Sequence, residues 1–226
     1  MANLDARGPA AVILDLDGVL IDSEAVWDEA RRELAERSGG TWKPDSQRAM
    51  MGMSSTEWSR YMHEELGVPM PAAEISTAVT ADLERRYREG VPLIPGAREA
   101  VIGLGGRWPL GLASSANRPI IDLVLREADL ARYFQATVSS EEVARGKPAP
   151  DVYLEAAARL AVDPAACVAV EDSANGLRAA AAAGMRVVAI PNREFPPDPE
   201  ALAMANLELG SIEELTPAVV AGLSRC

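Results

Sequence analysis

Two aspartates follow a short apolar run near the start of the chain. The run is AVIL at residues 11–14, and the acids are Asp15 and Asp17, with Gly18 directly after them. An apolar, β-branched segment that stops at carboxylates is typical of a buried parallel strand that carries the acids at its C-terminal end. Ligands bind at that end in open α/β sheets. The two acids can therefore share one reaction, one as nucleophile and the other as proton donor.

Three further polar motifs follow in order. Ser114 comes after an apolar segment, Lys147 lies in a Gly-Lys-Pro loop, and Glu171 and Asp172 follow the apolar segment 167–170. If these segments are neighbouring parallel strands, four carboxylates converge at one edge of the sheet. Carboxylates about 4 Å apart repel by roughly 4 kcal/mol per pair at an effective dielectric constant of 20. They need a compensating cation, and an all-oxygen ligand set favours Mg²⁺.

Composition limits the other functions open to this chain. Its 226 residues, 48% hydrophobic and 25% charged, are enough for one core domain and a smaller module. The formal net charge of −12 argues against a nucleic-acid partner, because phosphate backbones require basic surfaces. A small phosphorylated metabolite is still compatible as a partner, since a metal ion and a lysine make a site locally positive.

The cysteines and the apolar segments bear on location. Cys167 and Cys226 match neither a disulfide framework nor a zinc site, which fits a reducing compartment. Residues 1–9 carry no apolar signal region, and no apolar stretch approaches the ~20 residues of a membrane span. We therefore expect a cytoplasmic protein with no membrane partner, and a monomer because no segment requires a second copy.

Hydrophobic periodicity divides the chain into an all-helical part and an alternating part. Helical patterns cover 23–37, 54–66 and 71–88, and Ser54 with Glu57 has the spacing of a capping box. From residue 93 onward, strands and helices alternate, which predicts βαβ units and a parallel sheet. The expected strands are 109–113, 136–138, 167–170 and 185–190, and the expected helices are 97–105, 118–127, 150–161 and 174–183.

The first strand, at 11–15, precedes the all-helical part. The simplest arrangement places this strand in the same sheet as the later ones. The expected fold class is therefore α/β, with a Rossmann-like doubly wound parallel sheet formed by residues 1–21 and 93–226. Residues 22–92 would be an inserted helical cap domain over the C-terminal edge of that sheet.

These motifs, in this order, resemble those of the haloacid dehalogenase superfamily of phosphatases, and the resemblance covers nearly the whole chain. In chain order, the four motifs are Asp15 with Asp17, Ser114, Lys147, and Glu171 with Asp172. Segments 15–24, 146–151 and 170–173 resemble the β-phosphoglucomutase-like subfamily, which includes sugar- and sugar-alcohol-phosphate phosphatases. In that subfamily a helical cap is inserted where this sequence becomes helical.

The resemblance implies an aspartyl-phosphate mechanism. Asp15 would attack phosphorus, and Asp17 would protonate the leaving alkoxide and then deprotonate the hydrolytic water. Ser114 and Lys147 would hold the phosphoryl oxygens, with Ser115 as the rival of Ser114 for this role.

The resemblance also implies the magnesium ligands. These are the Asp15 carboxylate, the backbone carbonyl of Asp17, and Asp172, while Glu171 would act through a metal-bound water.

Two departures from the subfamily bear on the reaction. The mutases have a histidine where this chain has Trp27, and a cap arginine in a Gly-x-Ser-Arg-like stretch where it has GMSS at 52–55. A mutase needs that second anion contact to hold a bisphosphorylated intermediate. The sequence therefore favours a phosphatase acting on a small phosphorylated sugar or sugar alcohol, with a hexose-phosphate mutase as the alternative.

Substrate choice is expected to depend on the cap. Aromatic faces suit the C–H faces of polyols, and Glu24 and Asn117 are candidate contacts for hydroxyl groups. The residues that could form an apolar and stacking wall over a sugar chain are Trp27, Met51, Met53 and Trp58.

Other readings are weaker. A dehalogenase attacks carbon and needs neither a metal nor a second aspartate, so Asp17 and the acidic pair at 171–172 argue against dehalogenase activity. The helical insertion argues against a phosphoacceptor receiver domain. Single residues also have simpler roles open to them. Ser114 or the acidic pair could cap a helix, Lys147 could be a solvated loop charge, and Trp27 could pack in the core.

Overall fold

A six-stranded, all-parallel sheet forms the centre of the protein in the computed structural model, which describes residues 8–51, 53–193 and 196–223. Residues 1–7, Gly52 and Cys226, on which the sequence analysis drew, lie outside the described residues. The strand order is β3-β2-β1-β4-β5-β6. The strands are β1 (Ala11–Leu14), β2 (Leu110–Ser114), β3 (Phe134–Ser139), β4 (Cys167–Glu171), β5 (Arg186–Ala189) and β6 (Leu207–Glu208).

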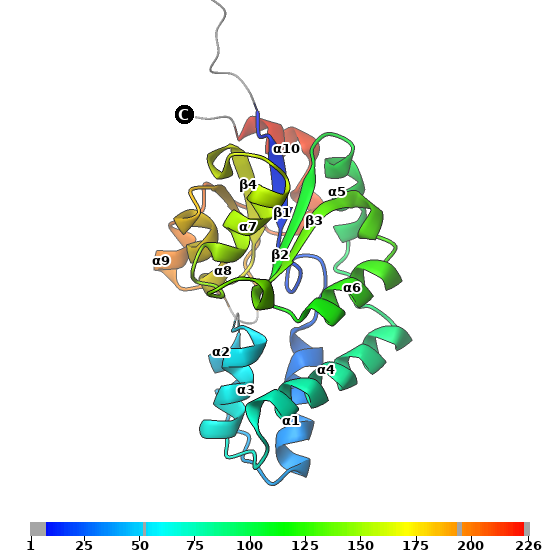
Figure 1. The fold of residues 1–226 in the computed structure, drawn as a ribbon. Helices are drawn as coiled ribbons and strands as arrows, with labels where there is room; N and C mark the ends of the chain where they lie inside the picture. The colour runs from blue at the N-terminus through cyan, green and yellow to red at the C-terminus, as the bar shows by residue number, and fades with distance from the viewer. Residues whose placement is uncertain (1–7, 52, 194–195, 224–226) are drawn as a thin grey trace, which may run out of the picture.

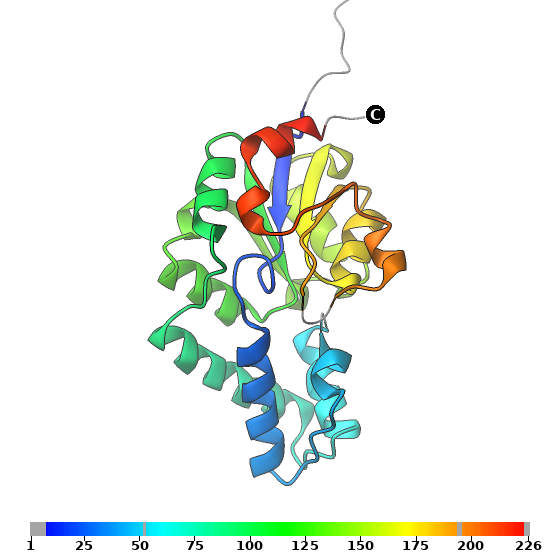
Figure 2. The ribbon, with the colours of Figure 1, turned by 180° about the vertical axis from the view of Figure 1, so that it is seen from behind.

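Helices cover both faces of the sheet, as a doubly wound fold requires. Figure 1 shows α7 and α8 over one face and α5 and α6 over the other, and Figure 2 shows the molecule from behind. The helices of this part are α5 (Ala97–Gly105), α6 (Arg118–Glu127), α7 (Asp151–Arg159), α8 (Ala174–Ala182), α9 (Pro199–Leu202) and α10 (Pro217–Gly222), and the 3-10 turns are η1 (Ala131–Tyr133), η2 (Ser140–Glu142), η3 (Pro164–Ala166) and η4 (Ile212–Glu214). The predicted α/β class is confirmed.

The central strands are apolar on both sides because both of their faces are covered. All four residues of β1 are fully buried, with alternate side chains in the two hydrophobic clusters on either face. Leu14 pairs with Leu112 of β2 and with Val170 of β4. This register places the polar residues that follow the three strands at the same edge of the sheet.

Four helices lie beyond that edge, in the lower half of Figure 1. They are α1 (Glu24–Arg37), α2 (Ser46–Met50), α3 (Ser55–Glu64) and α4 (Ala72–Glu89), here called the cap helices. They share a core that includes Trp58, Met62 and Leu83, all fully or almost fully buried. The predicted capping box is present, with Glu57 accepting from the Ser54 backbone N–H at 2.8 Å. Within the described part of the chain, no helix has the length and apolarity needed to cross a bilayer.

Candidate active site

Strand β1 delivers Asp15 to a point beside the end of β4. The Asp15 N–H donates to the carbonyl of Val170 at 3.0 Å, and the Asp15 side chain is 8% exposed. Gly18, three residues on, has a φ of +78°, and a Cβ there would lie 2.0 Å from an Asp172 carboxylate oxygen. Only glycine satisfies both the backbone conformation and this close approach. The Asp-x-Asp-Gly motif therefore makes room for the acidic group that comes from β4.

Three buried carboxylates meet at this edge. Ligand oxygens of Asp15, Glu171 and Asp172 all lie within 4.8 Å of one another. Burial raises the pKa of Asp15 to about 8, with Lys147 opposing the rise and Glu171 and Asp17 adding to it. Burial and the two neighbouring acids also raise the pKa of Asp172 well above its usual value. Such groups stay ionised at neutral pH only with more positive charge than the lysine supplies, so the donor set fits a divalent cation.

Lys147 is buried between two of these acids. Its Nζ donates to Asp15 Oδ1 at 2.8 Å and to Glu171 Oε1 at 2.5 Å. Burial alone would lower the pKa of this lysine, but the charges of the two acids outweigh it and raise the pKa. Lys147 is therefore an ammonium group next to the expected nucleophile, which contradicts the simpler reading of a solvated loop charge.

Both oxygens of Glu171 are occupied by the protein. Oε1 also accepts from the Tyr153 hydroxyl at 2.6 Å, and Oε2 accepts from the Ser173 hydroxyl at 3.2 Å. A Cβ at Gly176 would lie 1.9 Å from this carboxylate, so the first turn of α8 is shaped around it. Glu171 holds Lys147 in place; its expected role through a metal-bound water stays a prediction. The cap of α8 is Ser173, whose Oγ accepts from the Gly176 N–H.

Asp17 is held by the start of α1. Its Oδ1 accepts from the Ser23 hydroxyl at 2.5 Å and from the indole N–H of Trp27 at 2.9 Å. Trp27 was expected as part of an apolar wall over the substrate. It lines the cavity, and it is also a hydrogen-bond donor to the candidate acid/base, a role that its apolar character in the sequence does not signal.

Of the two serines at the end of β2, Ser115, just after the strand, lines the cavity, and Ser114, its last residue, does not. The Ser114 side chain is fully buried, and its Oγ accepts from the Ala116 N–H at 3.0 Å. Asn117 is also absent from the lining, and its amide donates to Glu141 at 2.7 Å. Its expected contact with a substrate hydroxyl stays a prediction, as does the role of Ser114 toward phosphate.

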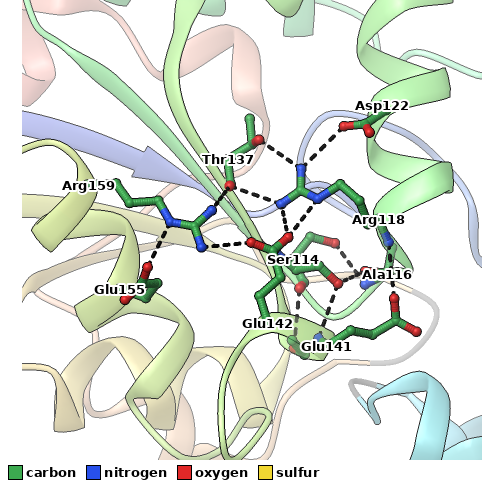
Figure 3. Close-up of polar contacts among 11 residues, drawn as sticks. Ser114, Ala116, Arg118, Asp122, Thr137, Glu141, Glu142, Glu155 and Arg159 are labelled. Carbon is green, nitrogen blue, oxygen red and sulfur yellow. Dashed lines mark hydrogen bonds and ion pairs between the residues drawn. The ribbon is translucent and has the colours of Figure 1, made fainter.

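The loop after β2 is braced from β3 and η2 (Figure 3). The Ser140 hydroxyl donates to the carbonyl of Ser114 at 3.2 Å, while Arg118 and Arg159 both pair with Glu142. The neighbouring Glu141 also reaches the cap, since it accepts from the Ser55 hydroxyl of α3 at 2.6 Å. One carboxylate thus joins the cap helices to the strand ends.

A cavity with about 550 Å³ of empty space, including open solvent at its mouth, lies between the strand ends and the cap helices. The core supplies mainly acids, Lys147 and Ser115, and the cap supplies mainly aromatic and methionine side chains. Its cap lining comprises Glu24, Trp27, Arg31, Met50, Met51, Met53 and Trp58. The expected apolar wall is therefore present around the cavity.

Arg31 is the charged lining residue that sequence reasoning missed. It lies one helical turn after Trp27 on α1, and that i,i+4 spacing was the available signal. The side chain is 5% exposed, and burial lowers its pKa to about 10 despite the opposing effects of Glu24 and Asp17. A charged guanidinium therefore faces a mainly apolar part of the cavity.

Comparison with known families decides the assignment of the chain. Residues 9–184 match the haloacid dehalogenase-like hydrolases. This chain belongs to that family. It is 38% identical over 212 residues to hexitol phosphatase B of Escherichia coli K12, a match that covers 91% of this chain and 94% of the relative. This haloacid dehalogenase-like hydrolase is a phosphatase of that superfamily.

Two other matches come from other bacteria. The phosphorylated carbohydrates phosphatase of Thermotoga maritima is 36% identical over 176 residues, covering 77% of this chain and 82% of that protein. The crystal structure of CbbY from Rhodobacter sphaeroides in complex with phosphate superposes with a TM-score of 0.83 at 27% identity, covering 95% of this hydrolase and all of that chain. The fold, with a helical region beyond the sheet edge, is shared along nearly the whole length.

Proposed function

We propose that this chain is a Mg²⁺-dependent phosphatase that hydrolyses the monophosphate ester of a small sugar or sugar alcohol. The observation that carries the proposal is the pairing of Asp15 with Lys147 at 2.8 Å, inside a cavity that the aromatic cap residues cover. The similarity to hexitol phosphatase B and to the phosphorylated carbohydrates phosphatase supports the substrate class.

The residues present fit Mg²⁺. The Asp15 and Asp172 carboxylates and the backbone carbonyl of Asp17 would hold the ion, and Glu171 would contribute through a water. When bound, the ion supplies the positive charge that keeps these buried acids ionised and offsets the charge of the phosphoryl group.

In the proposed reaction, Asp15 attacks phosphorus, and the ester P–O bond breaks as the new acyl-phosphate bond forms. Asp17 gives its proton to the leaving alkoxide. It then takes a proton from the water that attacks the aspartyl-phosphate, which releases phosphate and regenerates Asp15. Lys147 pairs with charge on the phosphoryl oxygens, and Ser115, which lines the cavity, donates to them in this proposal.

The proposal also includes the partner, the oligomeric state and the cellular compartment. The partner is a small phosphorylated metabolite, and the enzyme is a monomer in the cytoplasm. The free, buried thiol of Cys167 is compatible with a reducing compartment. A hexose-phosphate mutase is the second candidate, because the Arg31 guanidinium in the cap lining is a cation of the kind that a mutase needs to hold a second phosphate.

Phosphate release from a panel of sugar, sugar-alcohol and acid phosphates tests the proposal, with Mg²⁺ or with EDTA. Wild type, Asp15→Asn and the control Asp122→Asn, whose side chain is 59% exposed on α6, are compared. We expect Mg²⁺-dependent release by wild type and the control, and none above background by Asp15→Asn. Release that survives Asp15→Asn would exclude this nucleophile. Turnover of glucose 1-phosphate to glucose 6-phosphate, activated by a bisphosphate, would favour the mutase.

A further inference from the structure

The guanidinium of Arg31 is fixed between two aromatic rings at the cap end of the cavity. Its Cζ lies 4.5 Å from the ring centroid of Trp27 and 4.9 Å from that of Trp58. The two rings meet edge to face, with centroids 6.0 Å apart and planes at 66°. Cation–π contacts of this kind hold a guanidinium plane in one orientation. Arg31 is therefore a preorganised group rather than a mobile surface chain.

The hydrogen-bonding capacity of Arg31 is largely unused by the protein. Nη1 donates to Gln47 Oε1 over 3.4 Å, and the buried Nε has no partner among the described residues. Within the same residues, no carboxylate lies within 4.0 Å of the guanidinium. Burial of a charged donor without acceptors is costly, so a ligand that brings oxygen acceptors into the cavity would relieve it.

Glu24 lies beside Arg31 in the lining and is tied to it through α2. Gln47 Nε2 donates to Glu24 Oε2 at 2.7 Å, while the same amide accepts from Arg31. Gln47 is itself buried and thus fixes the two charged groups relative to each other. Arginine is only a donor, and an ionised carboxylate is only an acceptor. A hydroxyl group is both, so neighbouring hydroxyls can satisfy the two groups together.

The charges at this end favour an uncharged ligand. Glu24 and Arg31 offset each other, and the negative charge of Asp17 also acts on Arg31. A second phosphate or a carboxylate at Arg31 would also face the negative charge of Glu24. The faces of Trp27 and Trp58 suit the C–H surface of a polyol.

We propose that Arg31 and Glu24, positioned by Gln47, bind the uncharged polyhydroxyl end of the substrate and so determine specificity. The proposal deepens the proposed function and rests on it for the position of the phosphate. It assigns recognition of the substrate hydroxyls to two cap residues, with Arg31 as the hydrogen-bond donor and Glu24 as the acceptor.

Kinetics with matched substrates test the pair. Wild type and Arg31→Met are compared on a hexitol 6-phosphate, the corresponding sugar-acid 6-phosphate and p-nitrophenyl phosphate, which has no hydroxyl. Loss of hydrogen bonds to a charged donor should raise KM for the hexitol phosphate about 10- to 100-fold. The kcat/KM for p-nitrophenyl phosphate should change less than about 3-fold, because the reacting groups are untouched.

Three further variants separate recognition from folding. Arg31→Lys keeps the charge and should recover part of the hexitol phosphate affinity. Gln47→Ala should weaken binding of the same substrate by about 3- to 10-fold and should not add fully to Arg31→Met, because it acts on the same pair. Arg32→Met, on the adjacent exposed position of α1, is the control and should match wild type on every substrate.

Binding to a catalytically inactive protein keeps this test independent of turnover. Calorimetric titration of hexitol 6-phosphate into Asp15→Asn, with and without Arg31→Met, should show a 10- to 100-fold difference in Kd. That result would support the pair even if the proposed hydrolysis failed. Equal losses on all substrates, or no loss in Kd, would overturn the proposal. A wild-type preference for the sugar-acid phosphate or a bisphosphate, abolished by Arg31→Met, would overturn it in favour of an anion site.

Discussion

The indole N–H of Trp27 donates to Asp17 Oδ1 at 2.9 Å, across a spacing of ten residues. The donor belongs to the first turn of cap helix α1, and the acceptor belongs to the loop that follows β1. Ser23 donates to the same oxygen at 2.5 Å. The candidate acid/base is thus oriented by the segment through which the chain passes from the sheet into the cap, so cap position and Asp17 orientation are physically linked.

Replacing Trp27 by phenylalanine should lower kcat more than it raises KM. Phenylalanine keeps a smaller aromatic ring in the cavity but has no N–H, so the hydrogen bond that orients Asp17 is lost. Positioned acid/base catalysis contributes about 10²- to 10⁴-fold, and we expect about 10-fold of this to be lost. The measurement compares kcat on two substrates. An alkyl phosphate has a poor leaving group that must be protonated as it departs, whereas p-nitrophenyl phosphate has a good leaving group that needs protonation less. Trp58→Phe, in the same cavity, is the control; equal effects of both variants would contradict the role given to Trp27.

Replacing Gly176 by alanine should disable the site through Glu171. The added Cβ would lie 1.9 Å from the Glu171 carboxylate, so the acid must move and Lys147 loses one of its two carboxylate partners. We expect a loss of at least about 100-fold in kcat/KM and roughly 2 kcal/mol in the free energy of unfolding. Gly103→Ala is the matched control, because the helical Gly103 has its nearest contact at 3.5 Å.

Alanine at Gly103 should be neutral or stabilising by up to about 1 kcal/mol. Urea unfolding and steady-state kinetics of the two variants give both readouts. A fully active Gly176→Ala would show that Glu171 does not need its present position.

Magnesium should stabilise the wild-type protein against heat, and Asp172→Asn should not respond. A ligand that binds only the folded state at 100 times its Kd adds about 2.7 kcal/mol to stability. Melting curves of both proteins, with EDTA and with increasing Mg²⁺, test this without any substrate. In EDTA we expect Asp172→Asn to melt above wild type, because it removes one of three mutually repelling carboxylates. An equal rise in Tm for both proteins would place the ion elsewhere.

The ion pairs of Glu142 that brace the loop after β2 should weaken in acid. Burial acts to raise the pKa of Glu142, but hydrogen bonds from Arg118 and Arg159 outweigh it and hold the pKa below its usual value. A depressed folded-state pKa means that the contribution is present above the unfolded pKa and is lost as pH falls through the folded one. Glu142→Gln should therefore be less stable than wild type in thermal melts at pH 7. The difference in the free energy of unfolding should be no more than about 1 kcal/mol, and it should disappear below about pH 4. A gap that is independent of pH would assign the effect to packing.

The sequence was most informative where backbone geometry alone decides position. Parallel strands end at one edge, so the acids after β1 and β4 had to meet, and Asp15 and Asp172 do. The class of the fold followed from the same alternation of strands and helices. Short elements gave no such pattern: β6 has two residues and α2 has five, too few for a period to be detected.

Contacts between side chains of separate cap helices could not be predicted. Arg31 and Gln47 are sixteen residues apart and meet only because α1 and α2 pack together. Trp27 and Gly176 were visible as an aromatic residue and a helix glycine, but nothing local shows that one donates to Asp17 and the other makes room for Glu171. Such roles depend on which groups the tertiary structure brings within about 3 Å.

The bond between Ser55 and Glu141 has a consequence for the timing of turnover. Glu141 also accepts from Asn117 and from the Arg118 backbone N–H, just after the loop that carries Ser115. If the cap swings away from the core, Glu141 gives up the Ser55 hydroxyl but keeps its partners in the core. Release of product and entry of bulk water into the cavity would then both require this one hydrogen bond to break, so a stronger Ser55–Glu141 bond would slow both steps together.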